Sequence, residues 1–346
     1  MNLTFWITED CNLRCKYCYV SKNAKYFNNE NIDSTFQFLT QLIENSHEKY
    51  FNVNFHGGEP TLNFSVIEKI VDRFKKLKEQ HDLHIRYYIT TNGTVMNKKI
   101  MSFMIDNNFN ISLSVDGTKD IHDANRIYSN GLGSFDKTMG TLKLFKERNY
   151  HVRIRMTITP LTVNNLFDSY KYFYEMGYLG ITAVPDTTTS EWNQESVKNY
   201  EIEMNKISKY LYSKSERDFN NHIHNLSICI FKKLEICDGG INTFHISAHG
   251  DIYPCALVVG QEKFNIGNAK NGLNNNKIEN FRKEYSINNQ QCQKCSLMQF
   301  CEGNRCKYIN YASTGSFHKP SPSYCSLHRK QFFVVKNAKE NYETKV

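Results

Sequence analysis

Cys11-Asn12-Leu13-Arg14-Cys15-Lys16-Tyr17-Cys18 places three thiols within eight residues, directly after the apolar run Leu3-Thr4-Phe5-Trp6-Ile7. Cysteines at this density are not expected of ordinary core residues, and they indicate a metal site. Iron-sulfur clusters normally take four thiolate ligands, so a loop that supplies three leaves one iron open. An open metal position is where a substrate or cofactor binds. The alternative is a zinc loop completed by a distant residue, although zinc motifs usually pair two C-x2-C units.

The C-x3-C-x2-C spacing, with an aromatic residue before the last cysteine, resembles the signature loop of the radical S-adenosylmethionine (radical SAM) superfamily. In that family SAM chelates the open iron through its amino and carboxylate groups, and electron transfer cleaves SAM to a 5′-deoxyadenosyl radical. The resemblance implies that Cys11, Cys15 and Cys18 hold a 4Fe-4S cluster and that Tyr17 lies in the SAM site.

Length and composition limit the size of the fold, the cellular location and the classes of partner. The chain has 346 residues, which allows a large body plus a smaller module. Its 11 cysteines, with the acidic pair Glu9-Asp10 interrupting any early apolar segment, indicate a reducing, cytoplasmic location and no disulfides. No apolar run approaches the roughly 18 residues of a membrane span. The formal charge of +8 is spread without a basic block, so neither a membrane nor a nucleic acid is an expected partner.

Strand and helix patterns alternate through the first half of the chain. Six β-α units in a row predict an α/β fold, with parallel strands closing into a partial (β/α)6 barrel of the TIM type. Chemistry in such barrels lies at the carboxyl ends of the strands. The predicted strands are 3–8, 51–55, 85–90, 110–115, 152–158 and 180–184, and the predicted helices are 33–47 with Asp33 as N-cap, 64–80, 98–107, 134–149, 166–176 and 197–212.

His56-Gly57-Gly58-Glu59-Pro60 follows the second predicted strand. By itself it is a good turn sequence. Two glycines also let the backbone approach a ligand closely, and a carboxylate beside them can accept hydrogen bonds from an ammonium group. After a C-x3-C-x2-C loop the stretch resembles the GGE motif of radical SAM enzymes. The resemblance implies that Gly57, Gly58 and Glu59 hold the methionine amino group of SAM.

Two further loops follow the third and fourth predicted strands. They contain Thr91-Asn92-Gly93-Thr94 and Ser114-Val115-Asp116-Gly117, and Asn-Gly and Asp-Gly form turns in any protein. In this register they resemble segments of peptide-modifying radical SAM enzymes, which implies that Asn92, Ser114 and the later Arg126 contact SAM. The alternative for Arg126 is a solvent-facing ion pair with Asp120 or Asp123.

The remaining eight cysteines all lie beyond a polar bridge, and clustering of this kind argues for metal sites. Their spacing resembles the SPASM extension of radical SAM enzymes, a C-terminal module with two auxiliary 4Fe-4S clusters. The family's connectivity implies one cluster on Cys229, Cys237, Cys255 and Cys306, and a second on Cys292, Cys295, Cys301 and Cys325.

Three points about these cysteines stay open. Cys229 lies outside the seven-cysteine core of the family. Cys301 and Cys306 enclose four residues where the family has three, so an enlarged turn through Gly303-Asn304 is expected. A zinc ribbon is the alternative for Cys292-x2-Cys295 taken alone. The expected division of the chain is a barrel over 1–190, a helical bridge over 191–228, a SPASM domain over 229–330 and a tail over 331–346.

The resemblance implies an enzyme with SAM and three 4Fe-4S clusters as cofactors. SPASM members mostly modify ribosomally made peptides or proteins, so the expected function is a peptide maturase that forms a thioether, a carbon-carbon or carbon-oxygen crosslink, or an oxidised residue. The expected partners are a peptide or protein substrate and an electron donor such as flavodoxin or ferredoxin. The first predicted strand begins at Leu3 and leaves no room for a leader-binding module before it, so a separate leader-binding protein is also considered.

Two alternative functions remain. Anaerobic sulfatase-maturating enzymes oxidise Ser or Cys to formylglycine and carry an aspartate base after a Tyr-Pro-Cys segment, whereas this chain reads Tyr253-Pro254-Cys255-Ala256. Alanine cannot take a proton, so another carboxylate, Asp251 or Asp186, would have to replace the base. A non-catalytic module that binds several zinc ions is the other alternative, and it leaves the glycine loop unexplained.

Overall fold

The computed structural model describes the backbone of residues 1–231 and 237–342, and the side chains of 1–226 and 237–341. The chain divides into two units. The first, unit 1, consists of 1–115, 126–154 and 238–281; the second, unit 2, consists of 116–125, 155–237 and 282–346. Each unit therefore combines segments from the first and the second half of the chain.

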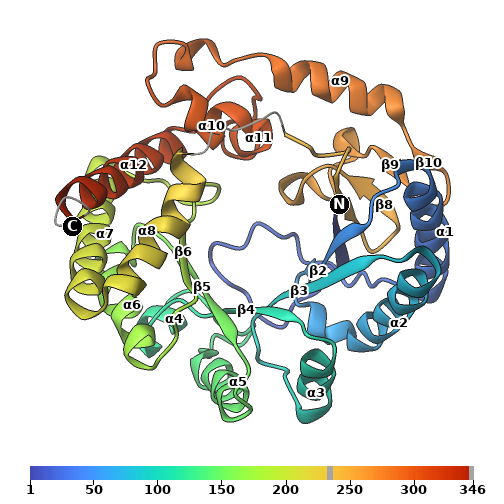
Figure 1. The fold of residues 1–346 in the computed structure, drawn as a ribbon, viewed down its shortest axis with the longest axis horizontal. Helices are drawn as coiled ribbons and strands as arrows, with labels where there is room; N and C mark the ends of the chain where they lie inside the picture. The colour runs from blue at the N-terminus through green and yellow to red at the C-terminus, as the bar shows by residue number, and fades with distance from the viewer. Residues whose placement is uncertain (232–236, 343–346) are drawn as a thin grey trace. The chain divides into compact units, whose positions relative to one another are not determined.

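A sheet forms the centre of unit 1, with strand order β10-β9-β8-β7-β1-β2-β3-β4 (Figure 1). The pairs β7-β1, β1-β2, β2-β3 and β3-β4 are parallel, and the pairs from β7 to β10 are antiparallel. The strands are β1 (Asn2–Thr8), β2 (Tyr50–Gly57), β3 (His84–Thr91), β4 (Asn110–Ser114), β7 (Thr243–Ile246), β8 (Asp251–Tyr253), β9 (Gly267–Asn268) and β10 (Gly272–Leu273).

The alternating sequence of the strands gives this sheet two different faces. Leu3, Phe5 and Ile7 of β1 are fully buried, and the Phe5 ring lies 5.9 Å from that of Phe74 in α2. Trp6 points to the opposite face, together with polar side chains of β2 and β7. Helices α1 and α2 cover the apolar face (Figure 1). The helices with most or all of their residues in unit 1 are α1 (Asn29–Ser46), α2 (Phe64–His81), α3 (Lys98–Asp106), α5 (Phe135–Glu147) and α9 (Asn275–Ser286).

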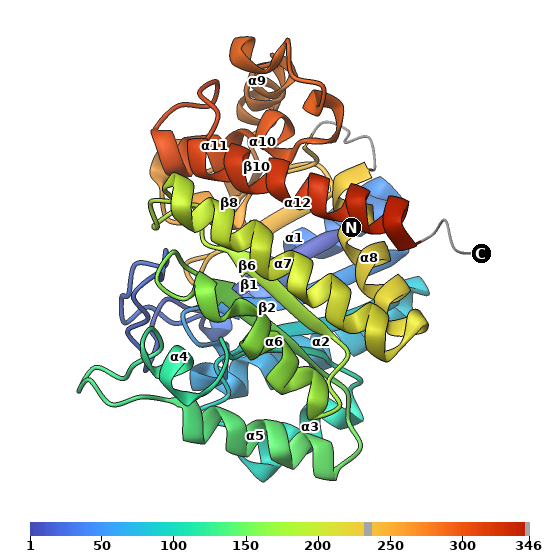
Figure 2. The same cartoon turned by 90° about the vertical axis from the view of Figure 1, so that its left-hand side faces the viewer.

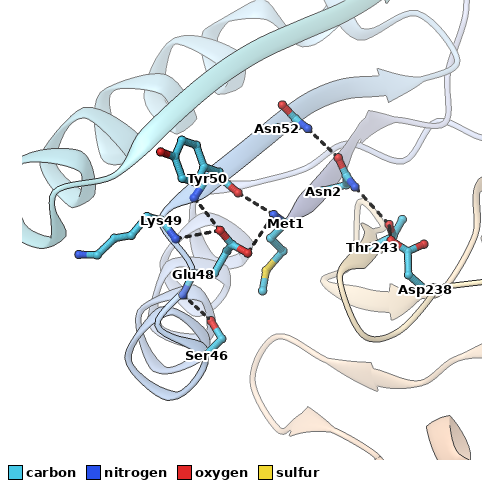
Figure 3. A network of polar contacts seen from close by, with 9 residues as sticks. All are labelled: Met1, Asn2, Ser46, Glu48, Lys49, Tyr50, Asn52, Asp238 and Thr243. Carbon is cyan, nitrogen blue, oxygen red and sulfur yellow. Dashed lines mark hydrogen bonds and ion pairs between the residues drawn. The ribbon is translucent and has the colours of Figure 1, made fainter.

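The amino ends of the central strands are tied together by side chains (Figure 3). Asn52 of β2 donates to Asn2 Oδ1 of β1 at 2.9 Å, and Asn2 Nδ2 donates to Thr243 Oγ1 of β7 at 3.5 Å. The amino group of Met1 donates to the carbonyl of Tyr50 at 2.6 Å. Because a one-residue slip would turn every side chain to the wrong face, these bonds help to fix the register of β1 between its neighbours.

Unit 2 is mainly helical. Helices α7, α8 and α12 lie side by side, with α6 against α7 (Figures 1 and 2). Strand β5 (Val152–Ile158) begins in unit 1 and ends in unit 2, where β6 (Ile181–Pro185) is its neighbour. The helices are α4 (Lys119–Asp123), α6 (Leu166–Glu175), α7 (Gln194–Lys214), α8 (Glu216–Phe231), α10 (Glu302–Arg305), α11 (Lys307–Thr314) and α12 (Pro322–Tyr342).

The predicted α/β class with a parallel core is confirmed, and β1 to β6 alternate with helices in chain order. The predicted N-cap of the first helix is wrong. Asn28 caps it, accepting from the backbone N–H of Asn31 at 2.9 Å, and Asp33 lies inside the helix, where it pairs with Arg73. Within the described part of the chain, no helix is long and apolar enough to cross a membrane.

Candidate active site

The first cysteine loop follows β1 directly. Backbone and side-chain donors point at its sulfur atoms: Leu13 N lies 3.4 Å from Cys11 Sγ, and Lys22 Nζ lies 2.9 Å from Cys18 Sγ. Burial raises the pKa of Cys11 to about 11, so this thiol needs a metal ion to become a thiolate at neutral pH. Hydrogen bonds to sulfur are one of the means by which proteins adjust iron-sulfur clusters, and the loop therefore suits such a cluster.

A hairpin over 126–134 holds the cysteine loop in place. Leu13 forms an antiparallel bridge with Tyr128, and Arg14 N donates to the carbonyl of Ile127 at 2.6 Å. The guanidinium of Arg126 lies 5.3 Å from the centre of the Tyr17 ring, within the range of a cation-π contact. Arg126 is only 7% exposed, so it is not a solvent-facing residue. The structure thus brings together two residues that were predicted from separate motifs.

The glycine loop after β2 packs directly on the backbone before Cys11. Gly58 N donates to the carbonyl of Thr8 and Glu59 N to that of Asp10, both at 2.8 Å. Gly57 has a φ of +134°, which favours glycine, and a Cβ atom there would lie 2.1 Å from Thr8 O. Both glycines are therefore required by the close approach of two backbone segments, in addition to any ligand.

Glu59 has protein partners that its motif does not reveal. Its Oε1 atom accepts from Thr61 N, Thr61 Oγ1 and Thr91 Oγ1 at 3.1, 2.5 and 2.7 Å, and Oε2 accepts from Asn92 N at 2.7 Å. The side chain is 1% exposed, and burial raises its pKa. The carboxylate thus ties the glycine loop to the end of β3. Only Oε2, with a single partner, keeps capacity for a further donor.

Asn92 connects this carboxylate to the cysteine loop. Its Nδ2 atom donates to Asn12 Oδ1 at 3.0 Å and lies 3.8 Å from Cys11 Sγ. Thr138 of α5 donates to the Asn92 carbonyl at 2.9 Å. Asn92, Glu59 and Cys11 therefore share one network, and Asn12 is a member that the sequence did not indicate. Ser114 ends β4 and is 8% exposed.

A polar cluster that the sequence did not indicate lies on the face of β1, β2 and β7 opposite to Phe5 and Ile7. Trp6 Nε1 donates to His245 Nδ1 at 3.4 Å, and the Trp6 ring lies 5.0 Å from that of His56. Gly57 N donates to His56 Nδ1 at 2.7 Å. Burial and the neighbouring His56 lower the pKa of His245 to about 3, so it stays neutral. Because Nδ1 of the neutral His245 ring accepts from Trp6, its proton lies on Nε2.

The two candidate bases differ in their surroundings. Asp186 accepts hydrogen bonds from Thr188, Thr189 and Ser190. Burial opposes its ionisation, but the bonds from Ser190, Thr189 and Thr188 outweigh it and hold the pKa of Asp186 below its usual range. This carboxylate stabilises its own loop and is poorly suited to take a proton. Asp251 begins β8 and accepts from Asn268 at 2.8 Å.

Most of the described cysteines of the second half belong to unit 2. Burial is the main cause that raises the pKa of Cys292 and of Cys301, with smaller contributions from Cys325 and Cys295 at Cys292, and from Cys325 and Cys292 at Cys301. Cys237 raises the pKa of Cys306 in the same way. Helix α10 forms a single turn between Cys301 and Cys306, at the place where an enlarged turn was expected.

The other two cysteines of the second half are Cys255 and Cys229. Cys255 precedes a short 3-10 turn, Ala256–Val258, in unit 1. The side chain of Cys229 lies outside the described residues. Among the side chains that are described, no three of the Cys, His, Asp and Glu type are arranged to hold a metal ion. Ligation by these residues therefore remains a prediction, which the donors at Cys11 and Cys18 and the cysteines of unit 2 favour.

Comparison with known proteins agrees with these features. Residues 7–173 match the Radical SAM superfamily, and residues 237–296 match SPASM, an iron-sulfur cluster-binding domain. A cysteine-type anaerobic sulfatase-maturating enzyme of Clostridium novyi is 27% identical over 324 residues, covering 85% of this chain and 84% of the relative. The subtilosin biosynthesis protein AlbA of Bacillus subtilis is 22% identical, covering 78% of this chain and 57% of AlbA.

Solved structures of radical SAM enzymes also resemble this chain. Native anSMEcpe with bound AdoMet has a TM-score of 0.79 and 25% identity, and the match covers 100% of both chains. Streptococcus suis SuiB bound to its precursor peptide SuiA has a TM-score of 0.65 and 18% identity, covering 94% of this chain and 75% of SuiB, which shows a shared fold. The chain therefore carries a radical SAM domain over residues 7–173 and a SPASM domain over residues 237–296.

Proposed function

We propose that this radical SAM enzyme abstracts a hydrogen atom from a ribosomally made peptide and thereby installs a thioether, a carbon-carbon or carbon-oxygen crosslink, or an oxidised residue. Its cofactors are SAM and 4Fe-4S clusters, which supply the 5′-deoxyadenosyl radical when bound. One observation carries the proposal: Cys11, Asn92 and Glu59 share a network at the carboxyl ends of β1 to β3. Relatives that include AlbA and the cyclopropyl synthase TigE favour a peptide substrate.

Each residue group has a role in this proposal. The first three cysteines would hold the cluster that binds SAM. Gly57, Gly58 and the free capacity of Glu59 Oε2 would receive the methionine part of SAM. The other SAM contacts and the auxiliary ligands are proposed as follows: Tyr17, Asn92, Ser114 and Arg126 for SAM, Cys229, Cys237, Cys255 and Cys306 for one cluster, and Cys292, Cys295, Cys301 and Cys325 for the other.

Sulfatase maturation is the second candidate, because several relatives carry that name. Ala256 argues against sulfatase maturation, because it follows Cys255 at the position where those enzymes carry an aspartate base. Asp186 is an unsuitable substitute because its oxygen atoms already accept five hydrogen bonds. Asp251 has one such bond and stays the better candidate. A non-catalytic zinc module is not supported, since the chain carries a radical SAM domain.

Formylglycine assays separate the two candidates. We expect the enzyme to cleave SAM but to form no formylglycine from a sulfatase-derived peptide with the target Ser or Cys, because the reaction needs a base within hydrogen-bond reach of the hydroxyl or thiol. Mass spectrometry is the measurement, and a cysteine-type sulfatase-maturating enzyme assayed in parallel shows that the peptide is competent. Loss of two hydrogen atoms from the Ser peptide, or of sulfur and two hydrogen atoms with gain of one oxygen atom from the Cys peptide, would refute the preference for another peptide modification.

Metal content tests the number of clusters. Protein purified and reconstituted without oxygen should hold about twelve irons, four for each of three clusters. The basis is the separation of the cysteines into three near the start and eight beyond residue 228. Iron and zinc are measured together by plasma mass spectrometry. Zinc in place of iron, or about four irons per chain, would contradict three clusters.

Partners, location and domain limits complete the proposal. The substrate would be a peptide or protein, electrons would come from a flavodoxin or ferredoxin, and a separate protein could present the leader. A reducing cytoplasm is the location that we propose, because the 11 cysteines of the chain are expected to serve as metal ligands. We keep the division into a barrel, a helical bridge and a SPASM domain as a proposal.

A further inference from the structure

Strands β7, β1, β2, β3 and β4 of unit 1 turn one set of side chains away from the apolar core. Strand pairing places Thr4 beside His245 and Asn54, and Asn54 beside Tyr88, so these side chains point to one face. Along β2, β3 and β7, buried residues alternate with half-buried ones, so this face is accessible. We call it the polar face, and its members in the middle of the strands are Thr4, Trp6, Asn54, His56, Tyr88, Thr90, Ser112 and His245.

The polar face lacks charge. None of its members is Asp, Glu, Lys or Arg, although 23% of the residues in the chain are charged. In the sequences of the five strands the only charged residue is Arg86, which is exposed near the beginning of β3. Lys and Glu are the residues that usually face water. The polar face therefore differs from an ordinary solvent-exposed sheet surface of this chain.

Several hydrogen-bonding atoms of this face lack protein partners. His245 Nδ1 accepts from Trp6 Nε1 at 3.4 Å, which leaves the proton of the neutral ring on Nε2. Within the described part of the chain, the atoms that have no partner and yet are not fully buried are His245 Nε2, Tyr88 Oη, Thr90 Oγ1 and Ser112 Oγ. Polar groups in such positions bind water or a ligand.

These atoms lie at the two sides of the polar face. Thr90 pairs with Ser112, and Tyr88 precedes Thr90 by two residues, so the three hydroxyl groups are neighbours. His245 lies in β7, beyond β1 and β2 (Figure 1). Adjacent strands are about 4.8 Å apart, so β7 and β3 are separated by at most roughly 14 Å. An extended chain rises about 3.3 Å per residue, so about four residues span this distance.

We propose that the polar face holds an uncharged segment of the peptide substrate, about four residues long, in which a backbone carbonyl accepts from His245 Nε2. Tyr88, Thr90 and Ser112 bind the other end of the segment through their hydroxyl groups. The inference rests on the proposed function and adds a property of its substrate. Charged residues are excluded from the segment, because a charged side chain would lose its water on a face that offers no opposite charge.

Displayed peptide libraries test this proposal without a known substrate. Short random peptides are selected on the full-length, reconstituted enzyme with SAM and without a reductant, so that binding is measured apart from turnover. Sequencing gives the frequency of Asp, Glu, Lys and Arg at each position of the aligned, enriched peptides relative to the unselected library. We expect a window of about four adjacent positions in which charged residues are depleted about fivefold. Charged residues at every position would overturn the proposal.

A charge placed on the polar face should change this preference. Tyr88→Glu should enrich peptides that carry Lys or Arg within the window, because the new carboxylate offers them a partner. Tyr50→Glu is the matched control, since Tyr50 is 67% exposed at the beginning of β2 and lies outside the middle of the face. The control should select the same peptides as the unsubstituted enzyme. If Tyr88→Glu also selects those peptides, the segment does not lie on this face.

His245 is tested with one peptide that the unsubstituted enzyme enriches. His245→Phe keeps a ring and removes the donor, so the affinity for the labelled peptide, measured by fluorescence anisotropy, should fall about five- to tenfold. His245→Gln should restore most of the affinity, because its Nε2 atom is also a donor. Equal affinities of His245→Phe and the unsubstituted enzyme would refute the role of this donor.

Failure of this inference and failure of the proposed function give different results. An enzyme that cleaves SAM to 5′-deoxyadenosine but enriches no peptide would show that the polar face meets only water, which overturns the inference and leaves the radical reaction in place. An enzyme that enriches uncharged peptides but forms no 5′-deoxyadenosine after reduction would contradict the proposed function instead.

Discussion

We expect that changing Cys11, Cys15 and Cys18 together to Ala abolishes reductive cleavage of SAM, while the auxiliary clusters stay bound. This is the expected result because the three thiols follow β1 in unit 1, whereas six of the other eight cysteines belong to the described part of unit 2. Metal sites formed by separate ligand sets load separately. SAM cleavage should be lost completely, since no other described cysteine lies in this loop.

The experiment measures 5′-deoxyadenosine by liquid chromatography after reduction with dithionite, together with iron. The triple variant should keep about eight irons of about twelve. Undiminished production of 5′-deoxyadenosine would refute the assignment of this loop. Iron falling to zero would show that the three sites depend on one another.

The second large effect is expected of Gly58→Ala. A Cβ atom at Gly58 would lie 2.0 Å from Asp10 O and 2.9 Å from Glu9 O, and both are backbone atoms. Backbone cannot rotate away as a long side chain does, so the segment leading into Cys11 must move. Overpacking of this kind costs about 1–3 kcal/mol. If the conformation that binds SAM bears this whole cost, the affinity for SAM falls about fivefold to 150-fold.

Anaerobic titration with SAM, followed by the change in the cluster spectrum, measures this affinity. Gly140→Ala is the matched control, because Gly140 lies within α5 and a Cβ atom there meets nothing within 4 Å. Alanine favours helix over glycine by about 1 kcal/mol, so the control should be neutral or more stable. Unchanged SAM binding by Gly58→Ala would show that the close packing of the glycine loop is not needed at this site.

Local patterns in the sequence were sufficient for most of the strands and helices. Phe51, Val53 and Phe55 alternate with Asn52 and Asn54, and this period predicts a strand that is buried on one face. The N-cap at Asn28 was missed because several Asn and Asp residues near the start of α1 are equally good caps, and only the tertiary fold selects one. Helix α8 was not predicted as a separate element, although most of it lies within the helical bridge that was expected over 191–228.

Contacts between distant segments could not be predicted. The partners of Glu59 lie up to 33 residues away, at Thr91 and Asn92, and nothing in the GGE motif indicates them. The same is true of Trp6 and His245, which are 239 residues apart. The motifs therefore located the loops of the site. The hydrogen bonds that hold these loops could not be predicted, because they form only after strands that are distant in sequence have paired.

Strand β1 has one neighbour close along the chain and another far away. Asn2 pairs with Asn52 of β2 on one side and with Thr243 of β7 on the other. During synthesis, the second edge of β1 must wait until residues 243–246 have left the ribosome. An unpaired apolar strand edge is a template for aggregation. Shortened chains that end before β7 should therefore be poorly recovered even though they contain every residue matched to the radical SAM family, and slow translation would prolong the exposure of this edge in the cell.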